Sequence, residues 1–187
     1  MQDAAPPSIR AIIGLGNPGP KYYHTRHSIG FRILDELAQR YDGMWHERDE
    51  MSSVDIIING KPVLLVKPQT FMNSSGRVVP ALLKKGIKSE NILVVHDELE
   101  LPFGTLKFKL GGSHRGHNGL RSIIGICGKD FMRLRFGIGR PAEGREPVDH
   151  YVLSQFKEPP QEVEEFVVRA ADMLEKVLEN PSISQKC

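Results

Sequence analysis

Residues 54–66 read VDIIINGKPVLLV, and this stretch decides what kind of sheet the chain can form. Two apolar runs, at 54–58 and 63–66, flank the residues NGKP, and an Asn-Gly pair between such runs is a strong signal for a β-hairpin. A tight hairpin joins two antiparallel strands. The sheet of this protein is therefore predicted to contain at least one antiparallel pair.

The segments on either side of the hairpin alternate between predicted strands and predicted helices. Apolar or alternating runs predict strands at 9–15, 92–95, 105–110 and 134–138. Apolar residues at helical spacing predict helices at 29–41 with Ser28 as N-cap, from Ser74 or Ser75 to Lys85 with Pro80 in the first turn, at 120–127 and at 163–177. This order predicts an α/β fold, a single domain over residues 9–179 with a twisted mixed β-sheet flanked by helices. We expect residues 1–8 and 180–187 to be flexible termini.

The composition is that of an ordinary globular protein, with 187 residues of which 26% are charged and 40% hydrophobic. No apolar run approaches the roughly 20 residues that a membrane span needs, and residues 1–8 lack the apolar core of a secretory signal. The two cysteines, Cys127 and Cys187, favour a reducing compartment. We expect a cytoplasmic protein without membrane association, and an organellar location stays open if a leader was removed. The sequence has neither an excess of apolar residues nor a heptad repeat that would indicate an obligate oligomer. We therefore expect a monomer.

One segment is strongly basic although the net charge of the whole chain is only +2. Residues 101–140 contain Asp130 as their one acidic residue and eight basic residues: Lys107, Lys109, Arg115, Arg121, Lys129, Arg133, Arg135 and Arg140. A segment of this charge favours a polyanionic partner such as a nucleic acid. A solvated surface without a partner is the alternative that charge alone leaves open.

A few polar residues offer a set of side chains suited to hydrolysis. The set contains one candidate base, His27, one carboxylate, Asp97, and three carboxamides, Asn17, Asn73 and Asn118. Such groups can activate water against a carbonyl and stabilise the resulting oxyanion. The set lacks the paired nucleophile and base of a covalent hydrolase, and the chain has no Gly-x-Ser-x-Gly motif of a serine esterase.

The glycines of GLGNPG at 14–19 match the dinucleotide-binding pattern GxGxxG, but their context does not. That pattern requires a helix that begins at the glycines and an acidic residue at the end of the next strand. Here the helix is predicted to start near Ser28, and Asp35 lies inside it. We interpret the glycines as a tight turn that brings Asn17 over the carboxyl end of the first strand.

These segments, in this order, resemble the bacterial-type peptidyl-tRNA hydrolases. The resemblance covers about residues 9–178 and rests on six motifs: GLGNPG at 14–19 with TRH at 25–27, FMNxSG at 71–76, HDEL at 96–99, KFKLGG at 107–112, GHNG at 116–119 and RLRxGIG at 133–139. It implies a single mixed-sheet α/β domain that hydrolyses the ester bond between a peptide and the 3′ end of tRNA, which frees the tRNA for reuse. It also implies that no metal or other cofactor is needed.

The resemblance assigns a role to each matching residue. His27 is implied to be the general base for water, Asp97 the carboxylate that orients it, and Asn17 a third catalytic residue that holds the water. Five residues are implied to bind the substrate in the same cleft: Tyr22, Met72, Asn73, His117 and Asn118. Three basic residues are implied to contact tRNA phosphate: Lys107, Lys109 and Arg135. The expected partner is therefore tRNA.

Two positions depart from the pattern of the bacterial members. Arg115 replaces a glycine in the loop before GHNG, and Ser28 replaces the asparagine that usually follows the catalytic histidine. Both look more like eukaryotic members. A noncatalytic RNA-binding protein on the same fold, similar to plant organellar splicing factors, is the alternative function. Such a protein could dispense with His27 or Asp97, so the presence of both favours the enzyme.

Overall fold

The predicted hairpin forms one side of the β-sheet in a computed structural model, which describes residues 8–181. Its strands, β3 (Met51–Ile58) and β4 (Lys61–Pro68), are antiparallel, with Val54 opposite Leu65. Asn59 and Gly60 have φ angles of 50° and 74°, as the tight turn of a two-residue hairpin requires. The hairpin is thus confirmed, and both strands are longer than predicted.

The hairpin belongs to a seven-stranded sheet with the order β2-β3-β4-β1-β5-β7-β6. The strands β1 (Ala11–Gly14), β5 (Ile92–Glu98) and β7 (Met132–Gly137) are parallel neighbours, and β1 also runs parallel to β4. The edge strands, β2 (His46–Arg48) and β6 (Leu106–Leu110), pair antiparallel with β3 and β7. The predicted α/β fold with a mixed sheet is confirmed.

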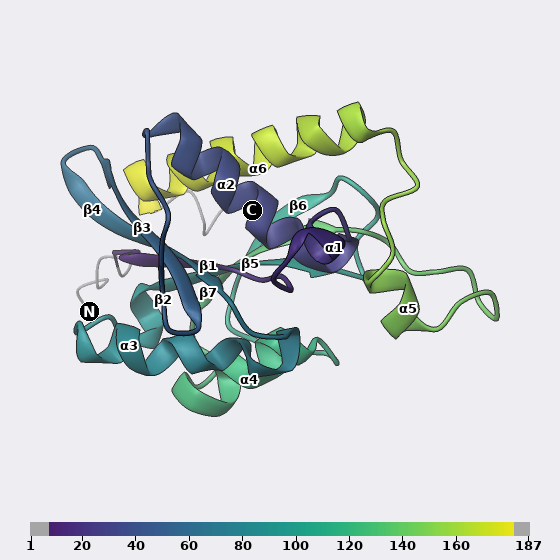
Figure 1. Cartoon of the computed structure of the whole chain (residues 1–187), viewed down its shortest axis with the longest axis horizontal. Coiled ribbons are helices and arrows are strands. Elements are labelled where there is room, and N and C mark those ends of the chain that lie inside the picture. Colours follow the sequence, from purple (N-terminus) through teal and green to yellow (C-terminus); the bar gives the residue numbers. More distant parts are fainter. Residues whose placement is uncertain (1–7, 182–187) are drawn as a thin grey trace, which may run out of the picture.

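Helices cover both faces of the sheet (Figure 1). The helices α2 (Ile29–Arg40) and α6 (Pro160–Glu179) lie on one face, and α3 (Val79–Lys84) and α4 (Asn118–Cys127) lie on the other. Each face has its own apolar core, and Leu93 and Val95 belong to the first core whereas Val94 belongs to the second. This alternation follows from the two-residue period of a strand.

The helix predicted from Ser74 or Ser75 to Lys85 is wrong in its first half. Residues Met72–Val78 form a 3₁₀ helix (η2), and the α-helix begins only at Val79. Pro80, in the first turn of α3, has no N–H group to donate to the carbonyl of Gly76 in a continuous α-helix. The N–H of Gly76 instead donates to Ser122 Oγ of α4 at 2.8 Å, so η2 is docked onto α4.

Several short elements were not predicted because they are too short to show a periodicity. Besides β2, they are α1 (Pro20–Tyr23), η1 (Arg26–Ser28), η3 (Ser89–Asn91) and α5 (Val148–Val152). Ser28 precedes α2 as predicted, but its side chain does not cap the helix. Its Oγ accepts a hydrogen bond from the backbone N–H of Asn17 at 3.1 Å, which ties the glycine-rich turn to the start of α2.

The termini that we expect to be flexible fall almost entirely outside the described residues. Of segments 1–8 and 180–187, only Ser8, Asn180 and Pro181 are described. Within residues 8–181, no helix combines the length and the apolar character that a membrane crossing requires.

The start of α2 lies directly against the carboxyl ends of β1 and β5. A β-carbon on Gly30 would lie 2.5 Å from the backbone nitrogen of Leu15 and 2.6 Å from the carbonyl oxygen of Val95, so only glycine permits this contact. Because His27 lies three residues before Gly30, the close contact places its side chain beside the end of β5. Open α/β sheets bind their ligands at such an edge.

Candidate active site

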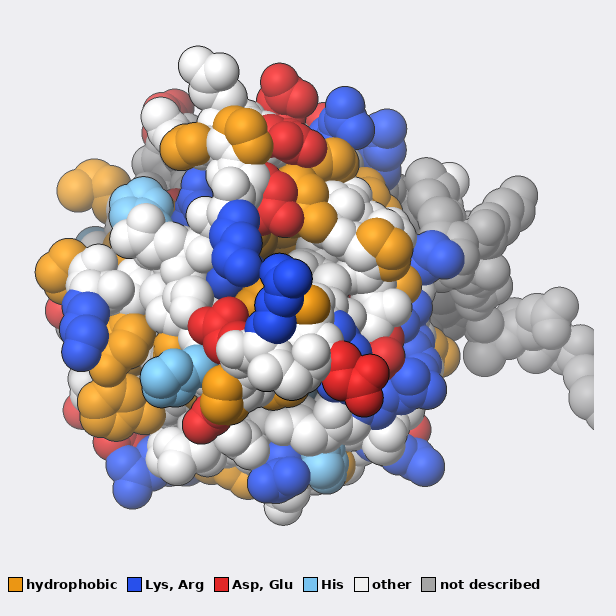
Figure 2. Space-filling model, turned by 90° about the vertical axis from the view of Figure 1, so that its right-hand side faces the viewer, with side chains coloured by type: hydrophobic (Ala, Val, Ile, Leu, Met, Phe, Trp, Pro, Cys, Tyr) orange, Lys and Arg blue, Asp and Glu red, His pale blue; other side chains and the backbone are white. Residues whose placement is uncertain are grey.

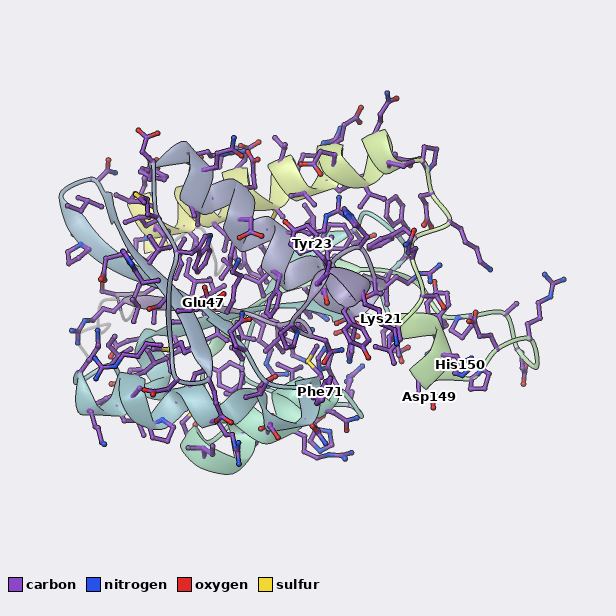
Figure 3. All side chains as sticks on the ribbon, in the orientation of Figure 1. Lys21, Tyr23, Glu47, Phe71, Asp149 and His150 are labelled. Atoms are coloured by element: carbon purple, nitrogen blue, oxygen red, sulfur yellow. The ribbon has the colours of Figure 1, made fainter. Side chains whose placement is uncertain are left out.

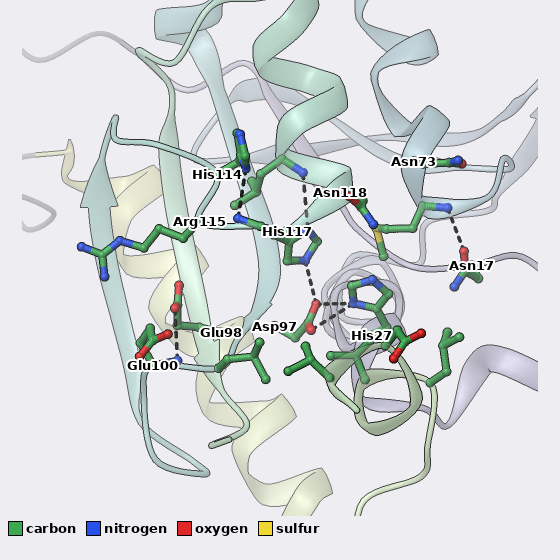
Figure 4. Close-up of a pocket in the computed structure, with 18 of the residues that line it drawn as sticks. Asn17, His27, Asn73, Asp97, Glu98, Glu100, His114, Arg115, His117 and Asn118 are labelled. Carbon is green, nitrogen blue, oxygen red and sulfur yellow. Dashed lines mark hydrogen bonds and ion pairs between the residues drawn. The ribbon is translucent and has the colours of Figure 1, made fainter. Parts of the chain in front are cut away.

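Asp97 connects three elements of the site. It lies near the end of β5, is 3% exposed, and accepts hydrogen bonds from His27 Nδ1 at 3.0 Å and from His117 Nε2 at 2.9 Å (Figure 4). Burial by itself raises the pKa of the Asp97 carboxyl, but the two imidazoles outweigh this effect and hold that pKa well below its usual range. Asp97 is therefore an ionised carboxylate between two N–H donors.

The hydrogen bonds define which nitrogen of each imidazole carries the proton. His117 Nδ1 accepts from the backbone N–H groups of Gly119 and Leu120 at 3.2 and 3.4 Å, so in neutral His117 the proton is on Nε2, facing Asp97. Because the Asp97 carboxylate can only accept, neutral His27 carries its proton on Nδ1. The Nε2 atom of His27 then has a lone pair that can take a proton. This is the arrangement of a base oriented by a carboxylate.

Asn17 is held at the end of the glycine-rich turn with one half of its carboxamide already bonded. The residue is 5% exposed, and its Oδ1 accepts a hydrogen bond from the backbone N–H of Met72 at 2.8 Å. The carbonyl of Met72 in turn accepts from Ser75 Oγ at 2.7 Å. With Oδ1 engaged in this way, the NH₂ group of Asn17 remains as a donor toward a ligand.

A cavity of about 650 Å³ opens beside His27. Its walls contain nine of the residues predicted for the site: Asn17, Tyr22, His27, Met72, Asn73, Asp97, Lys109, His117 and Asn118. These residues are scattered from the first strand to α4 in the sequence, and the sheet edge brings them to one place. A cavity of this size can enclose part of a ligand that is several residues or nucleotides long, as substrate clefts do.

The rim of the cavity is aromatic and amide-rich beside Asn17. The rings of Tyr22 and Phe71 pack edge to face with their centres 6.4 Å apart, and Phe71 is 65% exposed. Phe71 and Asp149 of α5 both line the cavity, and Figure 3 shows the two residues toward the same end of the molecule. Asn73 is exposed on the same rim. This side of the cavity therefore presents aromatic rings and carboxamides, and the ammonium of Lys21 lies 5.3 Å from the ring centre of Tyr22.

The predicted phosphate-binding residues lie on the paired edge strands β6 and β7. Lys107 and Lys109 flank the buried Phe108 and therefore share one face of β6, as predicted. In the antiparallel register, Lys107 is opposite Arg135 and Lys109 is opposite Arg133. Of the three predicted residues, only Lys109 lines the cavity, and the other two extend the same face away from it.

Arg133 is a cavity residue that the sequence reasoning missed. It is 3% exposed, its Nη1 donates to the carbonyl of Ser113 at 2.8 Å, and its Nη2 donates to the carbonyl of Gly112. Burial lowers the pKa of its guanidinium. Arg133 thus fastens the loop before α4 to β7. Strand alternation could have identified it, because Arg133 lies two residues before Arg135, which the resemblance assigned to phosphate contact, and strand residues two apart share a face.

The chain matches a known group of enzymes in sequence and in fold. The family model described as peptidyl-tRNA hydrolase matches residues 11–186. The chain belongs to the peptidyl-tRNA hydrolase family. The peptidyl-tRNA hydrolase of Rubrobacter xylanophilus is 44% identical over 167 residues, which cover 89% of this chain and 92% of the relative. That of Trichlorobacter lovleyi is 47% identical over 173 residues, with 90% and 88% covered.

Solved structures of the family share the fold. A crystal structure of peptidyl-tRNA hydrolase from Acinetobacter baumannii matches with a TM-score of 0.85 and 38% identity over 97% of this chain and 94% of that one. A crystal structure of a peptidyl-tRNA hydrolase with N-propanol matches with a TM-score of 0.83 and 38% identity, over 95% and 91%. The predicted resemblance to the bacterial-type family is confirmed.

In this member of the peptidyl-tRNA hydrolase family, a second buried histidine packs behind the site. His96 is 1% exposed, and its Nδ1 donates to the backbone carbonyl of Asp97 at 2.7 Å. Burial, followed by the charge of His117, lowers the pKa of His96 to about 3. His96 is therefore neutral at ordinary pH, and its ring lies edge to face with that of His117, 5.2 Å between centres.

One wall of the cavity comes from α5, which sequence reasoning did not predict. Val148, Asp149, Val152 and Leu153 line this wall. Arg26, next to His27, is 1% exposed; its guanidinium lies 3.9 Å from the ring centre of Tyr151 and donates to the carbonyl of Tyr151 at 3.0 Å. Figure 2 views this end of the molecule and shows basic side chains interspersed with acidic and apolar ones.

The two imidazoles and the carboxylate could also supply ligand atoms to a metal ion. One atom each from His27, Asp97 and His117 lie within 4.8 Å of one another. However, the nitrogens that face Asp97 carry the protons of its two hydrogen bonds, and a metal would have to replace both protons. Hydrolysis without a metal or other cofactor stays a prediction.

Proposed function

We propose that His27 is the general base with which this chain hydrolyses peptidyl-tRNA. The chain is a peptidyl-tRNA hydrolase, an enzyme that cleaves the ester bond between a peptide and the 3′ end of tRNA. In the proposed mechanism, His27 Nε2 takes a proton from a water molecule as its oxygen attacks the ester carbonyl. Asp97 accepts the Nδ1–H bond and stabilises the imidazolium that forms. The single observation that carries this proposal is the 3.0 Å hydrogen bond from His27 Nδ1 to Asp97 at the wall of the cavity.

The same imidazolium supplies the proton for the second half of the reaction. When the tetrahedral intermediate collapses, the bond between the carbonyl carbon and the ribose oxygen breaks. His27 Nε2 then donates its proton to that oxygen, so the tRNA leaves with a free hydroxyl, and the peptide leaves as a carboxylic acid that releases its proton to solvent. One general base is enough because an ester needs less activation than an amide. The released tRNA returns to translation, which fits a role in ribosome rescue.

The carboxamides are proposed to hold the water, the carbonyl and the peptide main chain. Asn17 has only its NH₂ group left to donate, which suits the attacking water or the developing oxyanion. Asn73 and Asn118 line the same cavity and are exposed, so they can reach the amides of a peptide. Carboxamides bond to main-chain groups whatever the side chains are, which suits a substrate of arbitrary sequence. Tyr22 and Met72 would contact the substrate through their apolar surfaces.

His117 is proposed to do two things in the same place. Its ring lines the cavity, which supports the predicted contact with substrate. Its Nε2–H also holds the carboxylate of Asp97, which the sequence reasoning did not foresee. A residue that both contacts substrate and holds the carboxylate would affect the chemical step more than the binding step.

The basic face of β6 and β7 is proposed to bind the tRNA backbone. Lys107, Lys109 and Arg135 lie on one face, and Lys109 connects that face to the cavity. Phosphate contacts from lysine and arginine supply affinity and register without reading sequence. We further propose that the enzyme acts as a monomer in the cytoplasm without membrane association.

The test compares the hydrolysis of N-acetyl-aminoacyl-tRNA with that of free aminoacyl-tRNA. Free aminoacyl-tRNA carries an ammonium where the substrate has an amide, and that charge resists desolvation in the cavity. We expect strong preference for the N-acetylated form. Equal rates on both would indicate a general esterase, and no turnover with intact tRNA binding would favour the noncatalytic RNA-binding alternative.

A further inference from the structure

Arg115 has an unusual backbone conformation in the loop between β6 and α4. Its φ angle is 46°, in the left-handed region, where a β-carbon crowds the backbone. Within residues 8–181, the other non-glycine residues with positive φ are Asp42, Asp49 and Asn59. Aspartate and asparagine tolerate this region because their short side chains bond locally, whereas arginine has no such advantage. Arg115 therefore carries strain.

No contact of its own side chain offsets this strain. Among the described residues, the Arg115 guanidinium makes no hydrogen bond and no ion pair, although its charge, after that of Arg140, helps to lower the pKa of the Glu100 carboxyl, and the residue is exposed. Arg140, on the same cavity, is instead paired with Glu100. The other nearby carboxylate, Glu98, accepts the backbone N–H of Glu100 at 3.2 Å. The acidic groups of this wall thus have partners, and the guanidinium of Arg115 is available to a ligand.

Arg115 belongs to the same cavity as the catalytic pair, on the side away from the carboxamides. It lines the cavity together with His27 and Asp97. In Figure 4, the pair lies between Arg115 on one side and Asn17 and Asn73 on the other. A substrate with its ester at His27 can therefore extend toward the carboxamides in one direction and toward Arg115 in the other.

On the side of Arg115, the cavity wall carries two carboxylates, Glu98 and Glu100, and a larger number of cations. Lys109, Arg133 and Arg140 line the cavity with it, and Lys109 and Arg133 are directly opposite each other on β6 and β7. Arg133 donates hydrogen bonds to two carbonyls of the loop that carries Arg115. The backbone of this loop is therefore held in place, whereas the guanidinium of Arg115 is not. Of the two halves of a peptidyl-tRNA, only the tRNA carries a negative charge at every residue.

We propose that Arg115 binds a backbone phosphate in the unpaired 3′ end of the tRNA while the ester lies at His27. This inference rests on the proposed function. A guanidinium presents a planar fork that matches two phosphate oxygens, so one residue can fix the direction of the strand. Arginine is then kept at this strained position because its side chain binds the ligand and does not stabilise the fold.

The experiment measures the affinity for deacylated tRNA over a salt series in wild type and three variants. Arg115→Gly removes the charge at a position where glycine is relaxed, and Arg115→Lys keeps the charge with the same strain. Lys88→Ala is the matched charge control, because Lys88 is exposed at the amino end of β5, opposite to the site. A second probe is the same tRNA without its unpaired 3′ end. Thermal unfolding of each variant reports whether the fold is intact.

For Arg115→Gly we expect Kd at low salt to rise roughly 3- to 10-fold, and the slope of log K against log salt to become shallower by about 0.7. Its Tm should stay within about 2 °C of wild type, because relief of strain offsets the freedom that glycine adds to the unfolded chain. Arg115→Lys should keep the slope, and Lys88→Ala should match wild type. On the truncated tRNA, wild type and Arg115→Gly should bind alike.

Three results would overturn the assignment. Equal affinities and parallel slopes for wild type and Arg115→Gly would make Arg115 a solvated surface charge. A defect that persists on the truncated tRNA would place the contact outside the 3′ end. A defect limited to the hydrolysis of substrates with an acidic peptide, with normal binding of deacylated tRNA, would assign Arg115 to the peptide. Failure of the proposed function is separate, because wild type would then not hydrolyse N-acetyl-aminoacyl-tRNA at all.

Discussion

His117 Nε2 lies 2.9 Å from the Asp97 carboxylate that also holds His27, so one carboxylate serves two imidazoles. The second donor stabilises the ionised form of Asp97 in a place where burial disfavours charge. His117 is itself fixed by the backbone N–H groups at the start of α4. The orientation of His27, the proposed base, therefore depends on a helix whose N-cap, His117, lies 20 residues after Asp97 in the sequence.

The first prediction concerns this second imidazole. His117→Ala removes one donor to Asp97 and should lower kcat by roughly 10-fold with little change in tRNA affinity. His117→Gln can still place an N–H group toward Asp97, so it should retain more of kcat. Both variants lose the cap of α4, which costs about 1 kcal/mol, so they should lose similar stability. Steady-state kinetics and urea unfolding check this, and equal kcat losses in both variants would assign His117 to packing alone.

The second prediction concerns the carboxylate. Asp97→Asn replaces an acceptor with a group that cannot stabilise the imidazolium of His27 as a carboxylate does. We expect a fall in kcat of roughly 10-fold or more, smaller than the loss in His27→Ala. Because the shape of the side chain is kept, KM should change little. An effect confined to KM would make Asp97 a substrate-binding residue and would contradict its assigned role.

The third prediction concerns stability in acid. The pKa of His96 is lowered to about 3 in the folded protein, whereas an unfolded histidine titrates near 6.5. Below about pH 6.5, His96 binds a proton in the unfolded chain but not in the folded chain. The free energy of unfolding therefore falls as the pH decreases toward 3. This one group contributes up to about 1.4 kcal/mol per pH unit over that range.

His96→Asn is the variant that tests this contribution. Asparagine can still donate an N–H group to the backbone carbonyl of Asp97, but it does not titrate. The free energy of unfolding in urea, measured from pH 7 to pH 4, should fall less steeply for His96→Asn than for wild type. Equal slopes for the two proteins would show that His96 is not the group that is kept neutral by burial.

The fold was predictable where local patterns are long and agree with the final packing. The hairpin at residues 54–66 has both its apolar strands and its turn residues in the sequence, and the 163–177 stripe of α6 was clear over many turns. In contrast, α5 has five residues, and β2 has three exposed ones, so neither shows a period. Their place in the fold comes from contacts with distant segments.

Most of the predicted site residues line one cavity, but the hydrogen bonds between them could not be predicted from the sequence. The strand predicted at 92–95 continues through the polar His96 and Asp97, because tertiary hydrogen bonds satisfy their side chains at the end of β5. No local pattern indicates that His117 donates to Asp97, since the two residues lie 20 positions apart. Arg133 was not predicted as a site residue because its role depends on hydrogen bonds to loop carbonyls 20 residues away in the sequence.

The fourth prediction concerns the basic face of β6 and β7. Lys107 and Arg135 are directly opposite each other, so the double variant Lys107→Ala with Arg135→Ala removes two neighbouring charges. It should raise KM more than it lowers kcat. The slope of log K against log salt for tRNA binding should become shallower by about 0.7–0.9 for each phosphate that the variant no longer binds. Slopes parallel to wild type would show that these side chains are solvated charges and that tRNA binds elsewhere.

Single-turnover hydrolysis of N-acetyl-aminoacyl-tRNA by His27→Ala, in buffer with EDTA, tests whether His27 is the general base. Saturating enzyme removes differences in binding, and parallel measurement of tRNA affinity and Tm shows that the variant is folded. If His27 has this role, we expect a rate at least about 10²-fold below wild type with nearly unchanged tRNA affinity, and full wild-type activity in EDTA. A near-normal rate for folded His27→Ala would contradict it.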